Sequence, residues 1–178
     1  MPSLPQDIAA LIEGEKMLGV TPEWDDKSNP RHLEILVPLS VGLVTVGGFE
    51  LRLKISKQFV ARDALAQLEF AVHGRRSAIA LWRIDWKPFH THSNDGVPPD
   101  CPLETFKGSH EHGFADHHIS SEQRMRAGNL PAVRRLDPDP GTLSDFLALC
   151  GMRFRINDIS RVRLPTVTPD LFWTPING

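Results

Sequence analysis

The sequence predicts an α+β fold, with one domain over residues 1–178 in which an antiparallel sheet of about five to seven strands is flanked by an N-terminal and a C-terminal helix. Three observations lead to this class. Apolar residues recur at helical spacing over residues 4–18, short apolar runs separated by turns fill residues 32–86, and a capped apolar stripe spans residues 142–150. A chain of 178 residues can bury one good core but is short for two domains.

The first expected element is an amphipathic helix over residues 4–18. Ser3 and Pro5 suit its beginning, and Gly19 suits its end. The apolar positions that define its buried face are Leu4, Ile8, Leu11, Ile12 and Leu18.

A meander of strands is expected next, over residues 32–86, because the apolar runs there are short and closely spaced. The connections through residues 40–42 and through Gly47 and Gly48 favour hairpins. The five expected strands cover residues 32–39, 43–46, 49–56, 67–72 and 78–86.

Strict alternation in the last of these strands places Arg83 and Asp85 on one face, with Trp82, Ile84 and Trp86 on the other. An ion pair within that face is the simplest explanation of Arg83 and Asp85. Alternatively, the two charges line a functional site, because the strand runs directly into a segment that is rich in histidine.

Residues 87–107 are too rich in proline for regular structure, so a long loop is expected there, followed by a strand near residues 108–114. The C-terminal helix begins after Thr142, a suitable N-cap, and ends at Gly151. Residues 154–156 are expected to form a last strand, and residues 165–178 an extended arm.

Features of the composition predict a cytoplasmic protein without a membrane partner. No apolar run approaches the roughly 20 residues that a spanning helix needs, and the N-terminus lacks the pattern of a secretory signal. Cys101 lies in a proline-rich context and Cys150 on an apolar helix face, so we expect two free thiols and no disulfide.

Positive charge is concentrated in residues 120–163, which contain eight arginines and no lysine, against five acidic residues. Arginine offers a planar set of donors that matches phosphate and carboxylate, so this region suits RNA, the ribosome or an acidic protein partner. The alternative is that these arginines pair with nearby acids. The eight are Arg124, Arg126, Arg134, Arg135, Arg153, Arg155, Arg161 and Arg163.

Histidines give the clearest indication of function, because six of the eight lie between positions 90 and 118. Four of them form two His-x-His pairs, His90 with His92 and His110 with His112. In an extended segment this spacing turns both rings of a pair to one side. A shared site is expected if rings of the two pairs lie within about 6 Å of each other and near Arg83.

Two chemistries fit these histidines. His90, His92, His110 and His112 could ligate zinc, copper or nickel. Alternatively, no cofactor is needed, and histidines perform acid–base catalysis on RNA while Arg83 stabilises the phosphate.

The run Leu81-Trp82-Arg83-Ile84-Asp85, followed by His90, Asn94 and then Gly108-Ser109-His110-Glu111-His112 with Phe114, resembles poorly characterised bacterial proteins related to TumE-like toxins of toxin–antitoxin modules. The resemblance covers residues 78–114. It implies a small α+β domain and a toxin that acts on RNA or translation. The residues that it picks out are Arg83, Asp85, His90, His110 and His112.

Three functional hypotheses follow. The first is a toxin-like, metal-independent ribonuclease with catalytic Arg83, Asp85, His90, His110 and His112. The second is a non-catalytic accessory protein of a phage or mobile element that binds an antitoxin or other protein. The third is a metalloprotein with histidine ligands.

Overall fold

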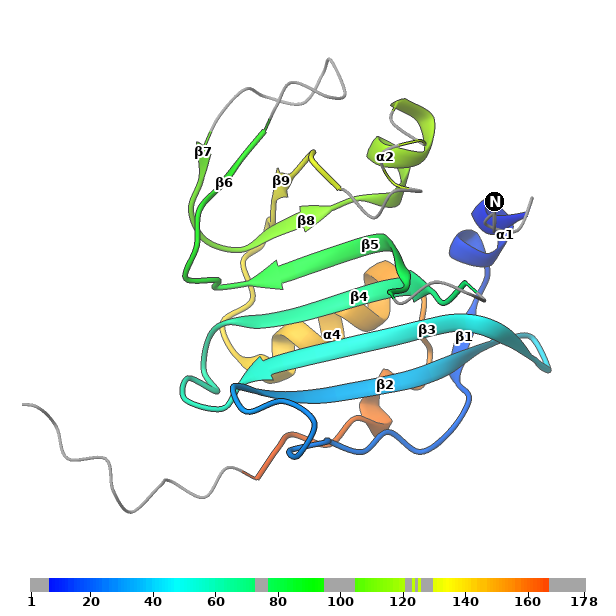
Figure 1. Cartoon of the computed structure of the whole chain (residues 1–178), viewed down its shortest axis with the longest axis horizontal. Helices are drawn as coiled ribbons and strands as arrows, with labels where there is room; N and C mark the ends of the chain where they lie inside the picture. The colour runs from blue at the N-terminus through cyan, green and yellow to red at the C-terminus, as the bar shows by residue number, and fades with distance from the viewer. Residues whose placement is uncertain are drawn as a thin grey trace, which may run out of the picture.

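The central feature of the computed structural model is an antiparallel sheet that has seven strands within residues 7–72, 77–94, 105–120, 123, 125 and 130–166, which are the residues that the structure describes. Its order is β1-β2-β3-β4-β5-β8-β9, so that neighbours in the sheet follow one another along the chain. Helix α4 (Leu143–Phe154) covers one face of the sheet, and α1 (Ile8–Glu13) lies near one end of the strands (Figure 1). The expected α+β class, with a helix from each end of the chain, is confirmed.

A separate two-stranded ribbon, β6 with β7, leaves the meander between β5 and β8. None of the described helices is long and apolar enough to cross a membrane. The strands of the large sheet are β1 (Lys16–Leu18), β2 (His32–Val41), β3 (Val44–Ser56), β4 (Ala64–Phe70), β5 (Ile79–Trp86), β8 (His110–His112) and β9 (Arg134–Arg135). The remaining elements with bounds in the described part of the chain are β6 (His92–Ser93), β7 (Thr105–Phe106), α2 (Phe114–Ser120) and the 3-10 helix η1 (Ile159–Arg161).

The core lies between the sheet and α4, and aromatic side chains join the two layers. Trp82 packs edge-on against Phe154 with ring centroids 5.5 Å apart, and Trp86 stacks on Phe146 at 5.7 Å. The indole of Trp86 also donates a hydrogen bond to the carbonyl oxygen of Pro140 at 2.8 Å. Large aromatic side chains supply much of the free energy of a core, so these contacts fix α4 against β5.

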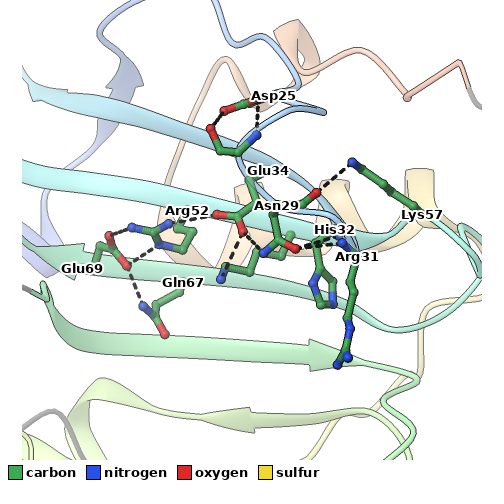
Figure 2. Close-up of polar contacts among 11 residues, drawn as sticks. Asp25, Asn29, Arg31, His32, Glu34, Arg52, Lys57, Gln67 and Glu69 are labelled. Carbon is green, nitrogen blue, oxygen red and sulfur yellow. Dashed lines mark hydrogen bonds and ion pairs between the residues drawn. The ribbon is translucent and has the colours of Figure 1, made fainter.

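The opposite face of β2, β3 and β4 carries an ion-pair network centred on Arg52 (Figure 2). Its guanidinium donates to both carboxylate oxygens of Glu69, at 2.9 and 2.7 Å, and to Glu34 at 3.2 Å. Gln67 also donates to Glu69, at 2.6 Å. The sheet therefore has an apolar face under α4 and a polar face, and the polar face continues across β5 toward the histidines.

The expected helix over residues 4–18 is too long at its C-terminal end. The described part of this helix, α1, ends at Glu13, and Lys16–Leu18 form β1, which pairs with β2. Backbone hydrogen bonds of Lys16 with Arg155 and Asn157, at 2.7 and 2.9 Å, hold this segment in the extended state. Tertiary pairing therefore overrides the helical spacing of Leu18.

Two predictions that depended on glycine are also wrong. Gly47 and Gly48 make no hairpin, because β3 continues through them as one strand, and the carbonyl of Gly48 accepts from Ala71 at 2.7 Å. Gly151 does not end the C-terminal helix, which continues to Phe154 and stops at Arg155 in the left-handed conformation.

The capping of that helix is confirmed, because Thr142 and Asp145 form a reciprocal capping box. The strand expected at residues 154–156 is absent from this described segment, where only Ile156 makes an isolated bridge, to Lys16. Cys150 is a buried free thiol. Cys101 and residues 167–178 of the expected arm lie outside the described residues.

Candidate metal centre

Strand β5 places Arg83 and Asp85 on the polar face of the sheet, as their alternation predicts. The guanidinium Nη2 of Arg83 donates to Oδ1 of Asp85 at 2.6 Å. Asp85 is only 2% exposed, so its carboxylate is shielded from water, whereas the Arg83 side chain is 31% exposed. Shielding strengthens the interaction between the charges and raises the cost of leaving any carboxylate oxygen unpaired.

Strand β8 brings two histidines beside this pair. His110 lies opposite Asp85 and His112 opposite Arg83 in the antiparallel register. Glu111 points to the other face, where it accepts from the indole of Trp82 at 2.6 Å. The expected strand around His110 and His112 is confirmed, and its alternation separates the histidines from Glu111.

A third histidine, His92 of β6, completes a cluster. Its ring centroid lies 5.7 Å from that of His110 and 4.9 Å from that of His112. Among the described residues, one ring nitrogen from each of these three histidines lies within 4.8 Å of the others. The two His-x-His pairs therefore meet, through one member of the first pair and both members of the second.

His92, and not His90, is the member of the first pair that lies beside His110 and His112. His90 is exposed, whereas His92 is partly buried against His110 and His112. The reason is that β6 begins at His92, so the two residues do not share one regular strand. His90 remains a predicted catalytic residue, but it lies outside the group of three.

In each ring of this three-histidine cluster, one nitrogen forms a hydrogen bond with a backbone carbonyl oxygen. Nδ1 of His110 lies 2.8 Å from the oxygen of Gly108, and Nδ1 of His112 lies 2.7 Å from that of Leu130. Nε2 of His92 lies 2.9 Å from the oxygen of Pro131. A carbonyl oxygen can only accept, so these three nitrogens carry the hydrogens, and in a neutral ring the other nitrogen carries the lone pair.

His117 differs, because both of its ring nitrogens have partners. Nδ1 donates to the carbonyl oxygen of Gly113 at 2.7 Å, and Nε2 accepts from the amide of Ala132 at 3.0 Å. Asn94 binds both backbone groups of Val133, at 2.7 and 3.1 Å. Together with His92 and His112, these side chains hold four successive backbone positions, residues 130–133, beside the cluster.

Asp85 faces the cluster with an oxygen that lacks a donor. Its Oδ2 lies 3.5 Å from Nε2 of His110 and 3.5 Å from Nε2 of His112. Oδ2 of Asp85 and Nε2 of His110 are both buried and have no hydrogen-bond partner. Atoms that would otherwise accept thus face one another, and a cation between them would satisfy all of them.

The electrostatics of the centre keep Asp85 ionised. Burial opposes the charge of Asp85, but His112 and the Arg83 guanidinium outweigh it and lower the pKa of the carboxyl to about 2. Burial lowers the pKa of His110 and of His112, against the opposing attraction of Asp85. At neutral pH the centre therefore holds an ionised Asp85 carboxylate beside the neutral imidazoles of His110 and His112.

Other side chains that could have served as ligands have different roles. Asp116 pairs with Arg134 at 2.7 Å, and the ring of His118 stacks on Phe114 with centroids 4.8 Å apart. Glu111 lies on the other face of β8, and Glu104 falls outside the described residues.

Several arginines of the basic region pair with acids, in agreement with the simpler interpretation of that region. Besides Arg134, the structure pairs Arg153 with Glu111 at 3.8 Å and Arg161 with Asp158 at 2.7 Å. Arg124 and Arg126 lie outside the described residues. An anionic partner stays a prediction.

Sequence reasoning missed the part that residues 130–133 play in the centre. The backbone carbonyls of Pro131 and Leu130 set the tautomers of His92 and His112. The sequence Leu-Pro-Ala-Val at these positions contains no motif that predicts such a role. For Asn94 the only signal in the sequence is its place in the family resemblance.

Comparisons with family models, with curated proteins and with solved structures found no match for this chain.

Proposed function

We propose that this protein is a metalloprotein that binds one transition-metal ion through His92, His110 and His112. The observation that carries the proposal is the hydrogen bonding of the three rings. Each donates to a backbone carbonyl through one nitrogen, which leaves the second nitrogen of each ring with a lone pair that a metal could bind. Histidines that bind metals characteristically have such a partner on the far nitrogen, because it fixes the tautomer and the ring orientation.

Distances support a small ion such as zinc. Zinc binds imidazole nitrogen at about 2.0–2.1 Å, so the nitrogens of a tetrahedral site lie about 3.3 Å apart. Since the three nitrogens lie within 4.8 Å of one another, the widest pair has to close by at most about 1.5 Å.

The test is a metal measurement on untagged protein. Elemental analysis should give one equivalent of zinc, nickel or copper, and the protein stripped of metal should take up one equivalent of zinc again. A protein that holds no stoichiometric metal after both steps would refute the proposal.

The variants should preserve the hydrogen bond of each ring while they remove its lone pair. An asparagine amide mimics Nδ1–H, and a glutamine amide mimics Nε2–H, so the suitable changes are His110→Asn, His112→Asn and His92→Gln. Each should weaken zinc binding by more than the roughly 10–100-fold that loss of an outer-shell partner costs. His90→Gln, two residues from His92 but exposed, is the matched control and should leave zinc affinity unchanged.

Metal-independent cleavage of RNA by a toxin-like protein is the second candidate. The arrangement of Arg83 and Asp85 beside His110 and His112 favours it, because these groups combine a cation with two bases. Burial weighs against it, since His110 is 1% and His112 4% exposed, which leaves a phosphate little surface of these rings to contact. RNA cleavage that persists in EDTA and disappears in His110→Asn would favour this candidate over the metalloprotein.

A further inference from the structure

We propose that Asp85 is the fourth ligand of the metal, through Oδ2, and that the ion is a structural cross-link with no open coordination position. This inference rests on the proposed metal site.

The two carboxylate oxygens of Asp85 have different surroundings. Oδ1 accepts from Arg83 at 2.6 Å, whereas Oδ2 has no hydrogen-bond partner although the side chain is buried. A buried carboxylate oxygen without a donor is costly unless a cation lies against it. Arg83 is thus a positioning residue, because it holds Oδ1 and leaves Oδ2 directed at the histidines.

The position of Oδ2 fits a tetrahedral site. It lies 3.5 Å from Nε2 of His110 and 3.5 Å from Nε2 of His112. This is close to the roughly 3.3 Å that separates two ligand atoms around tetrahedral zinc. One ion can therefore contact both nitrogens and the carboxylate with little movement of β5 or β8. In the proposed site His92, whose ring nitrogen lies within 4.8 Å of those of His110 and His112, supplies the fourth ligand.

The segments that carry the ligands explain what such an ion would do. Asp85 lies in β5 and the β8 histidines in its neighbour, so these strands are already paired. His92 comes from the β6–β7 ribbon, which is paired over only two positions. A two-stranded ribbon of this size has little stability of its own, and a metal bond through His92 would fix it to the sheet.

Burial agrees with a closed site. Asp85, His110 and His112 are 2%, 1% and 4% exposed, which leaves little room for a substrate beside them. Zinc sites with four protein ligands are structural, whereas catalytic sites keep one position for water.

Cobalt substitution of the full-length protein tests the inference, because Co²⁺ absorbs strongly in the visible range only when it is four-coordinate. The wild-type protein with one equivalent of Co²⁺ should show the strong tetrahedral bands, and added azide should not shift them. Asp85→Asn should become sensitive to azide, because a water molecule that azide can displace takes the place of the carboxylate. A wild-type spectrum that shifts with azide would overturn the inference, and this measurement holds even if Asp85→Asn fails to fold.

The two proposals can fail separately. One equivalent of bound Co²⁺ with an azide-sensitive spectrum keeps the metalloprotein and rejects the closed site, whereas no stoichiometric Co²⁺ rejects both. Hydrogen exchange gives an independent readout of the structural role. Removal of zinc should increase exchange at the amides of β6 and β7 and leave β2 and β3 unchanged; equal protection with and without zinc would overturn the cross-link.

Discussion

Lys16 should make the stability of this protein rise with pH in a range where few other groups change charge. Its side chain is fully buried, and Nζ donates to the carbonyl oxygens of Ile12 and Gly14 at 2.6 and 2.7 Å. These carbonyls belong to the end of α1, where helical partners run out. Burial, reinforced by the positive charge of Arg155, lowers the pKa of Lys16 from 10.5 to about 8.

The size of the effect follows from this difference in pKa. Between about pH 8 and 10.5 the unfolded chain holds a proton on Lys16 that the folded chain has released, so the free energy of unfolding rises with pH. The slope approaches about 1.4 kcal/mol per pH unit, and the whole contribution is about 3 kcal/mol. It is fully present above pH 10.5 and is lost as the pH falls through 8.

Urea unfolding of wild type and Lys16→Met at intervals from pH 7 to pH 10 measures this contribution. The comparison is needed because burial raises the pKa of Cys150, which makes stability fall at alkaline pH in both proteins. The difference between the two proteins should change by about 2.5 kcal/mol over this range, about three quarters of the whole contribution. A difference that stays constant with pH would show that Lys16 keeps its ordinary pKa and that the reasoning from its burial is wrong.

Three further changes should alter stability in urea unfolding at pH 7. Trp86→Phe removes the hydrogen bond to the Pro140 carbonyl and should cost about 1–2 kcal/mol; a neutral result would mean that water replaces the indole. Thr142→Ala removes the N-cap of α4 and should cost about 1 kcal/mol, and no loss would contradict the capping box. Gly48→Ala should cost about 1–3 kcal/mol, because Gly48 has a φ of +82° and a Cβ there would lie 2.5 Å from a carbonyl oxygen. Gly47→Ala meets nothing within 4 Å, so equal losses at the two glycines would refute this explanation.

The sequence was sufficient for the class of fold and for much of the sheet, because local periodicity decides these features. Alternation in residues 78–86 correctly put Arg83 and Asp85 on one face, where they form an ion pair. The N-cap at Thr142 followed from local hydrogen bonding and was also correct.

The wrong predictions share a physical cause. Each was based on local sequence, whereas the structure at these positions is decided by tertiary contacts. Lys16 leaves the helical pattern because β2 and residues 155–157 pair with it. Gly151 stays within α4 because its missing side chain lets Ile159 pack closely, and a Cβ there would lie 2.4 Å from an Ile159 methyl group. In each case an expectation based on local sequence was overridden by tertiary packing.

The candidate centre shows the same division. That His110 and His112 lie on one face of a strand near Arg83 was predictable from spacing. That His92, rather than His90, joins them was not, because this depends on where β6 begins and on the backbone of residues 130–133. Only coordinates show which ring nitrogen remains available.

The contacts on both faces of β8 require the same register between β8 and β5. His110 and His112 meet Asp85 on one side of the strand, while Glu111 bonds Trp82 on the other. A slip by one residue would exchange the two faces, so that a carboxylate would meet Asp85 and imidazoles would lie under α4. Such a misfolded chain loses the packing of its helix and the candidate metal site together, and a protein that binds the ion has therefore also paired its strands correctly.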